Sequence, residues 1–108
     1  MSQRERVLLD LNTPEFQKQL FQLGKEDLHR VLLTLKKLFR MTWDQVYCDP
    51  GLKWEVIGSR SGKSGDKVFS LRVSKKFRAV IVREDNWMRF ASLHPDHDSA
   101  YMGRRARS

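Results

Sequence analysis

The stretch "VFSLRVSKKFRAVIVREDNWMRFASLH", residues 68–94, decides the fold. Its apolar residues recur with a period of two, which is the pattern of strands that bury one face. The expected strands are residues 68–74, 77–84 and 87–94. Asp85 and Asn86 supply the turn before the last strand. Because the connections are short, consecutive strands should pair as antiparallel neighbours, and the stretch predicts an antiparallel meander.

The connection at residues 74–76 sets the register of the first two strands. An odd loop keeps the apolar residues of both strands on one face, and Arg72 and Arg78 then stand opposite each other on the other face. Two opposed like charges are unfavourable without an anion, and phosphate matches guanidinium geometry. The alternative is two solvated arginines that point apart. The same face carries Val80 and Val82, so either something covers it or a partner binds there.

The N-terminal part of the chain predicts a strand and then a helix. The apolar run at residues 7–11 is typical of a strand. In "NTPEFQKQLFQLG", Thr13 is a candidate N-cap, Pro14 suits the first helical position, and Gly24 suits the C-terminal stop.

A second helix is expected from Asp27 to Arg40. Its apolar stripe, which indicates a core-facing side, consists of Leu28, Val31, Leu32, Leu35 and Leu38. "MTWDQVYCDPG" indicates a short helical turn, in which Cys48 is interpreted as structural, and "LKWEVIGS" predicts another strand. The fold class is therefore α+β: an N-terminal strand, two helices, then a twisted antiparallel meander of about four strands.

Length and charge narrow the classes of function. A chain of 108 residues with 40% hydrophobic content suits one domain, expected over residues 1–101 and followed by a flexible basic tail at 102–108. The 21 Lys and Arg residues against 13 Asp and Glu residues give a net charge of +8. That excess favours nucleic acid as a partner, then an acidic protein, with a merely basic surface as the third interpretation. One cysteine and no leader or membrane span predict a cytoplasmic protein.

The segment "VIGSRSGKSGDKVFS" resembles a phosphate-binding P-loop, but its spacing is wrong. A P-loop needs four residues between its first glycine and the Gly-Lys pair, whereas only residues 59–61 separate Gly58 from Gly62 here. A P-loop also needs a following helix, and a strand follows here. The segment is better interpreted as a hairpin loop whose Arg60, Lys63 and Lys67 contact a nucleic-acid backbone.

The segment "SLHPDHDSAY", residues 92–101, gathers polar side chains after the last strand. His94 and His97 can transfer protons near neutral pH, and Tyr101 can stack on a base. The alternative for each histidine is a surface or capping role. Because no second ligand cluster accompanies these residues, neither a metal nor a cofactor is expected.

Most of the chain resembles the RelE/ParE superfamily, the toxins of bacterial toxin–antitoxin modules. The most specific piece is "FSLRVSKKFRAVIVREDNWMRFASLHPDHDSAY", although Ser74 and Lys75 stand where the family often has glycine. The RelE-like branch implies a metal-free ribonuclease that cuts mRNA within the ribosome. In that reaction the 2′-hydroxyl attacks the adjacent phosphate and leaves a cyclic phosphate and a free 5′-hydroxyl.

The resemblance also implies roles for residues and partners. Arg72 and Arg78 would hold the phosphate, His97 would act as acid or base, and Tyr101 would stack on or orient a base. His94 is this sequence's own addition, and its catalytic role stays open. The expected RNA-binding residues are Lys53, Arg60, Lys63, Lys67, Lys75 and Lys76. The implied partners are a cognate antitoxin, the ribosome and mRNA, with operator DNA reached only through the antitoxin complex.

Two other functions stay open. The ParE-like branch inhibits DNA gyrase and is not an enzyme, but its members generally lack a histidine pair such as the one in "HPDH". The third reading is a catalytically inactive family member that acts as a binding module.

Overall fold

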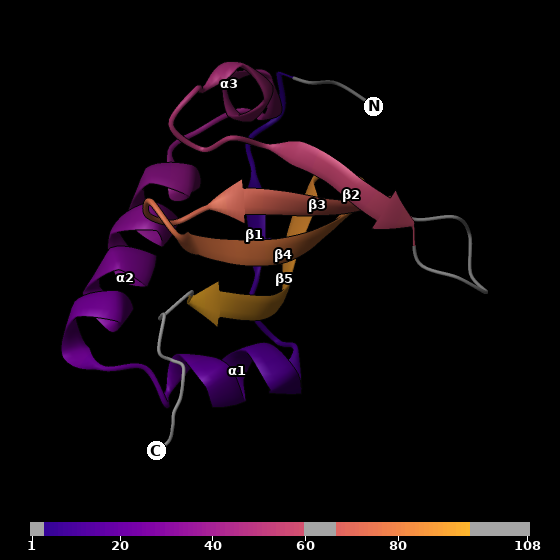
Figure 1. Ribbon diagram of the computed structural model, residues 1–108. Helices are drawn as coiled ribbons and strands as arrows, with labels where there is room; N and C mark the ends of the chain where they lie inside the picture. The colour runs from indigo at the N-terminus through magenta and orange to yellow at the C-terminus, as the bar shows by residue number, and fades with distance from the viewer. Residues whose placement is uncertain (1–3, 60–66, 96–108) are drawn as a thin grey trace.

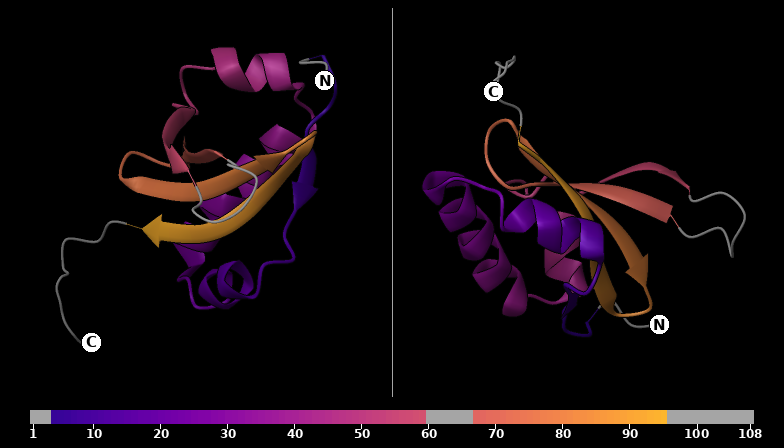
Figure 2. Two further views of the ribbon diagram at one scale, coloured as in Figure 1. Left: turned by 90° about the vertical axis from the view of Figure 1, so that its right-hand side faces the viewer. Right: turned by 90° about the horizontal axis from the view of Figure 1, so that it is seen from below.

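The computed structural model describes residues 4–59 and 67–95 of the chain. The elements are β1 (Leu8–Asp10), α1 (Pro14–Leu20), α2 (Lys25–Phe39), α3 (Trp43–Cys48), β2 (Glu55–Ser59), β3 (Lys67–Arg72), β4 (Phe77–Glu84) and β5 (Trp87–Pro95). The strands form one sheet in the order β1-β5-β4-β3-β2 (Figure 1). Helices α1 and α2 lie on the same face of this sheet (Figure 2). The expected α+β class is confirmed.

The meander from β2 to β5 is antiparallel, as expected, but the sheet as a whole is mixed. β1 pairs in parallel with β5, so that Leu8 lies beside Trp87 and Asp10 beside Arg89. A parallel pair needs a long crossover, which the helices and the other strands provide here. The apolar pattern of residues 7–11 carries no information on the direction of a partner strand, so the sequence did not predict how β1 pairs.

Gly24 ends no helix, contrary to expectation. α1 stops at Leu20, and two tightened hydrogen bonds follow, from the Gln22 N–H to the Gln19 carbonyl and from the Leu23 N–H to the Leu20 carbonyl. Gly24 has an extended backbone and is the N-cap of α2. The first helix is therefore shorter, and the second begins earlier, than the sequence pattern predicted.

Two further details differ from the expected helices. Leu32, predicted in the core stripe of α2, is 49% exposed, and Thr34 lies on the buried side instead. The third helix, α3, is a full element whose start is fixed by a capping box between Thr42 and Gln45. Cys48, interpreted as structural, is exposed at the end of α3 and lies outside the buried core.

The strand predicted from "LKWEVIGS" is also shorter than expected, because the backbone turns before it. Lys53 has a φ of 46°, in the left-handed region, which no strand residue adopts. One oxygen of Asp49 accepts hydrogen bonds from the N–H groups of Gly51, at 2.7 Å, and Leu52, at 3.1 Å. The Asp49 side chain thus holds a turn, and β2 starts only at Glu55.

The core lies between the helices and one face of the sheet. Its buried residues are Val7, Phe16, Val31, Leu35, Leu38, Met41, Trp43, Val46, Leu52, Phe69, Leu71, Phe77, Ala79, Ile81, Met88, Phe90 and Leu93. An aromatic cluster extends it under β3, where Trp54 stacks on Phe69 with ring centroids 4.4 Å apart. Each such side chain contributes about 1.5–3 kcal/mol by leaving water. The core therefore fixes which face of β3, β4 and β5 is turned away from the helices.

Candidate functional site

Three polar side chains form a row across β3, β4 and β5. Arg72 of β3 pairs directly with Arg78 of β4, and Arg78 pairs with His94 of β5. Their strand neighbours Leu71, Ala79 and Leu93 are buried in the core. Since successive side chains alternate between faces, the row lies on the face away from the helices, which we call the outer face. The predicted opposition of Arg72 and Arg78 is confirmed.

The turn between β3 and β4 explains how two opposed arginines are tolerated. Nη1 of Arg78 donates to the carbonyls of Ser74 and Lys75, each at 3.2 Å. These carbonyls carry partial negative charge and solvate the guanidinium group. Arg72 is half-buried, and its backbone N–H donates to the Leu52 carbonyl at 2.7 Å. Backbone carbonyls therefore hold the guanidinium group of Arg78, whereas Arg72 is held through its main chain.

His94 is exposed and has a hydrogen-bond partner on its own strand. Ser92 Oγ lies 2.8 Å from His94 Nε2, and the direction of the bond depends on the tautomer of the ring. Sequence reasoning did not assign Ser92 to the site. The signal was present, because residues two apart on a strand share a face. Ser92 thus sets the orientation of the ring that stands opposite Arg78.

A second row lies beside the first and brings a carboxylate onto the outer face. Ser70 pairs with Glu55 on one side and with Val80 on the other, and Val80 pairs with Ser92. Glu55 is exposed, and sequence reasoning gave it no role. Glu55 lies on the outer face because it pairs with Ser70. That pairing could not be predicted from the sequence without knowing that β2 contains a bulge.

The outer face also has an apolar part. Val68 pairs with Val82, and Val82 is only 2% exposed although it lies outside the core between helices and sheet. Val80 is half-buried. Val80 and Val82, the valines noted in the sequence, therefore form a largely buried apolar patch beside the polar rows.

The other predicted RNA-binding residues are not all gathered at this row. Lys75 and Lys76 are exposed in the turn beside Arg78. Lys53 follows Leu52, whose carbonyl accepts the hydrogen bond from the Arg72 backbone N–H. Lys67 is exposed at the far end of β3, about 17 Å from Arg72 at 3.3 Å per residue. Arg60, Lys63, His97 and Tyr101 lie outside the described residues.

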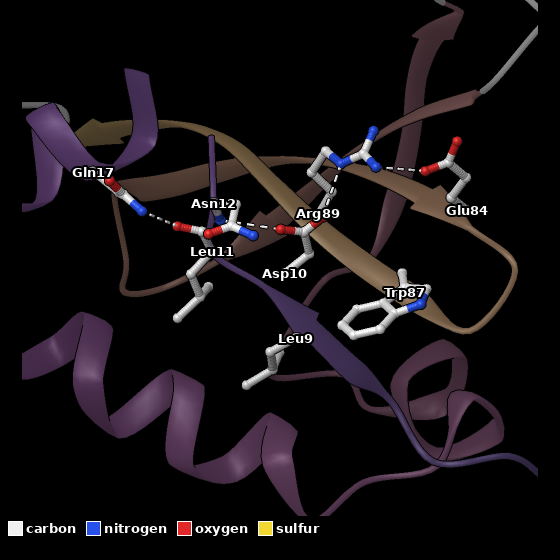
Figure 3. A pocket seen from close by; sticks show the side chains of 8 residues that line it. All are labelled: Leu9, Asp10, Leu11, Asn12, Gln17, Glu84, Trp87 and Arg89. Carbon is white, nitrogen blue, oxygen red and sulfur yellow. Dashed lines mark hydrogen bonds and ion pairs between the residues drawn. The ribbon is translucent and has the colours of Figure 1, made fainter. Parts of the chain in front are cut away.

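A hollow away from the row contains none of the predicted site residues. It has a volume of about 720 Å³ and lies at the edge formed by β1 and β5 (Figure 3). Within it Arg89 bridges two carboxylates: Nε lies 3.0 Å from Asp10 Oδ2, and Nη2 lies 2.6 Å from Glu84 Oε1 (Figure 3). These contacts tie the three-residue strand β1 to β5, and we assign the hollow a structural role.

The charge network has a direct effect on titration. A hydrogen bond from the Asn12 N–H, together with Arg89, holds the pKa of Asp10 below its usual value despite partial burial. The hydrogen bond to Asp10 and the charge of Glu84 raise the pKa of Arg89. Asp10 and Arg89 are therefore charged at neutral pH, and their ion pair stabilises the β1 edge there.

Within residues 4–59 and 67–95, no three His, Cys, Asp or Glu side chains come together as a metal site would require. In the same part of the chain no helix combines the length and the apolar character needed to cross a bilayer.

Comparisons with known proteins give similarity in structure only. No family model and no curated protein matches the sequence. A copper-bound mutant toxin from Helicobacter pylori is 18% identical, with 88% of this chain and 99% of that chain covered and a TM-score of 0.46. A YoeB dimer from Staphylococcus aureus is 15% identical, with coverages of 87% and 99% and a TM-score of 0.44. Values this low transfer no activity to this chain. The observed order of an N-terminal strand, helices and a meander is the order that the sequence predicted.

Proposed function

We propose that the chain is the toxin of a type II toxin–antitoxin module, and that it cleaves mRNA on the ribosome without a metal. The observation that carries this proposal is the row of Arg72, Arg78 and His94 on the outer face. Two guanidinium groups and an imidazole on neighbouring strands suit a phosphodiester and a proton transfer. The RelE-like sequence motif, which spans the same strands, supports the same function.

The reaction is a transfer within the RNA chain. A base removes the proton of the 2′-hydroxyl, the O2′–P bond forms, and the P–O5′ bond breaks. An acid delivers a proton to the departing 5′-oxygen, so the products are a 2′,3′-cyclic phosphate and a 5′-hydroxyl. The transition state carries extra negative charge on the phosphorane oxygens. In this proposal Arg72 and Arg78 bind those oxygens.

Several groups are available for the proton transfers. His94 stands opposite Arg78, and Glu55 lies in the adjacent row, so both are candidates on the outer face. The sequence resemblance adds His97 as acid or base and Tyr101 as a stacking residue. We propose that His94 is one of the two proton-transfer groups.

The charge of the molecule supports RNA as the substrate. The chain carries a net charge of +8, and Lys75 and Lys76 are exposed in the turn beside Arg78. Positive side chains near the row would bind neighbouring phosphates without reading sequence. The same charge suits an acidic antitoxin as the cellular partner, in the cytoplasm where ribosomes and mRNA are found.

The test is expression of the chain with and without a co-expressed antitoxin, together with translation of a defined mRNA by purified components. Expression alone should stop growth, and the antitoxin should restore it. Primer extension on the translated mRNA should show new 5′ ends that are absent without the protein. Normal growth at high expression would contradict the toxin proposal, whereas arrest with intact mRNA and blocked DNA gyrase would replace it with the ParE-like function.

A further inference from the structure

A small hollow opens where α2 meets the end of β3, next to the outer face. It has a volume of about 230 Å³. Its lining residues are Arg30, Leu33, Thr34, Lys37, Gly51, Leu52, Arg72 and Val73. Three of these residues, from two elements, carry a positive charge. Arg72 belongs both to the lining of the hollow and to the row on the outer face.

The positive charges in this hollow are only partly compensated. Lys37 Nζ lies 3.0 Å from Asp49 Oδ2. Among residues 4–59 and 67–95, the side chains of Arg30 and Arg72 form no hydrogen bond or ion pair. Arg30 and Arg72 thus line the same hollow, and one carboxylate is paired with Lys37. Positive residues that line one hollow are stabilised by an anion bound between them.

The wall opposite α2 is the turn at residues 49–52, and it fits closely against Lys37. A Cβ atom added at Gly51 would lie 3.1 Å from Asp49 Oδ1 and 3.7 Å from Lys37 Nζ. Asp49 also holds the N–H groups of Gly51 and Leu52. The turn therefore holds Asp49 against Lys37, which lines the hollow. A side chain at position 51 would require Asp49 to shift by a few tenths of an ångström.

We propose that the hollow binds a phosphate group of the nucleic-acid backbone, adjacent to the phosphate held by the row of Arg72, Arg78 and His94. The guanidinium forks of Arg30 and Arg72 match phosphate oxygens, and the ammonium group of Lys37 adds a point charge. This site deepens the proposed function, on which it rests, because it fixes the path of the RNA from the outer face toward α2. It also gives α2 a role beyond its buried side.

The test measures binding rather than cleavage, so that it stands apart from the proposed activity. The probe is a short single-stranded RNA with 2′-O-methyl groups, which cannot be cut by 2′-hydroxyl attack. Its dissociation constant is measured over a range of salt concentrations for the parent, Arg30→Gln and Lys36→Gln. Lys36 is the matched control because it is exposed on α2 but does not line the hollow.

The expected results differ between the two variants. Arg30→Gln should weaken binding about tenfold and lower the slope of log affinity against log salt by about 0.7, the value for one phosphate contact to a single strand. Lys36→Gln should change the slope by much less. Equal effects of the two substitutions would overturn the proposal while leaving the row and its cleavage chemistry untouched.

A second arm separates the backbone phosphate from a free anion. Inorganic phosphate is titrated into the labelled parent protein, and the Nε–Hε signals of Arg30 and Arg72 are followed by NMR. Competition between phosphate and the RNA at these signals supports the proposal. A response to inorganic phosphate with no response to the RNA would overturn it, because the hollow would then take only small anions. If the parent protein does not cleave mRNA but binds the RNA in a way that depends on Arg30, the enzymatic proposal fails and this binding site stands.

Discussion

At the scale of single residues, the central feature is a pair of opposed arginines whose repulsion the fold partly offsets. Arg72 and Arg78 are directly opposed, which destabilises a strand pair when nothing compensates it. The carbonyls of Ser74 and Lys75 take part of the Arg78 charge, and the neighbour of Arg78 on β5 is His94. A phosphate between the two arginines would relieve the remaining repulsion.

The two arginines should differ in how they respond to substitution. Arg72→Gln should slow cleavage by about a hundred- to a thousandfold, the usual loss when one donor to a transition-state oxyanion is removed. Arg78→Ala should abolish cleavage and also loosen the turn, because the carbonyls of Ser74 and Lys75 lose their donor. Arg78→Lys keeps a donor for the turn and should be folded but slow, since ammonium lacks the planar fork.

Single-turnover cleavage rates, with circular dichroism as the folding control, check this prediction. Lys36→Gln provides the matched loss of one positive charge away from the row. The site assignment fails when Arg72→Gln and Arg78→Lys are both folded and cut at the parent rate.

His94 should contribute a proton transfer to the reaction. His94→Ala should slow cleavage about a hundredfold or more, as expected for the loss of a proton-transfer group. Ser92→Ala should slow it less, because Ser92 Oγ only holds the ring at 2.8 Å. Single-turnover cleavage rates test this, and a parent-like rate in a folded His94→Ala variant would assign proton transfer to other groups, such as Glu55 or His97.

At the scale of elements, the sequence predicted the features whose causes are local. Strict alternation and an odd connection fixed the register that opposes Arg72 and Arg78. The parallel pairing of β1 with β5 depends on a contact between the two ends of the chain, which no local pattern records. Gly24 was predicted to end a helix, but glycine suits both a helix stop and an N-cap. Its extended backbone makes it the N-cap of α2.

The candidate site was predictable to the same extent. The row follows from alternation, whereas the hollow beside α2 needs Arg30 to meet Arg72 across the chain. The two residues come from α2 and β3 and are far apart in the sequence. No short segment contains both, so the sequence alone gave Arg30 no role.

Helix α1 should depend on one side chain for its docking. Phe16 is fully buried and lies against Phe90 of β5 with ring centroids 5.3 Å apart. Phe16→Ala should lower the free energy of unfolding by about 3–5 kcal/mol. Phe21→Ala, at a position that is 78% exposed, is the matched control and should change it by about 0.5 kcal/mol or less. Urea unfolding measures both, and equal costs would contradict the packing described for α1.

The turn before β2 should make stability depend on pH. Burial raises the pKa of Asp49, but hydrogen bonds from Lys37 and from the Leu52 and Gly51 N–H groups outweigh it and leave the pKa below the usual 3.8. The stabilisation is therefore complete above that pH and is lost as the pH falls through the lowered pKa of the folded state. Asp49→Asn should flatten the acid side of the stability curve. Parallel curves for parent and variant would show that the Lys37–Asp49 pair contributes nothing measurable.

At the scale of the whole molecule, one face of a single sheet carries the candidate chemistry and the other face carries the core. Helices α1 and α2 lie against the core face (Figure 2), and we propose that a partner binds the opposite face, which carries the polar rows. A net charge of +8 attracts RNA to the molecule, and the same charge would attract an acidic antitoxin that shields this face. Substrate and antitoxin would then compete for one surface.

The chemistry of the cut ends tests the proposed function most directly. A defined mRNA is translated by purified components with the parent protein or with Arg72→Gln, and the new fragments are isolated. The proposed attack by the 2′-hydroxyl predicts a 5′-hydroxyl, which a polynucleotide kinase labels without prior phosphatase treatment, and a 2′,3′-cyclic phosphate on the upstream fragment. Both products should fall by about a hundredfold or more with Arg72→Gln. Fragments with 5′-phosphate ends, or intact mRNA under conditions in which the folded protein stops growth, would contradict the proposal.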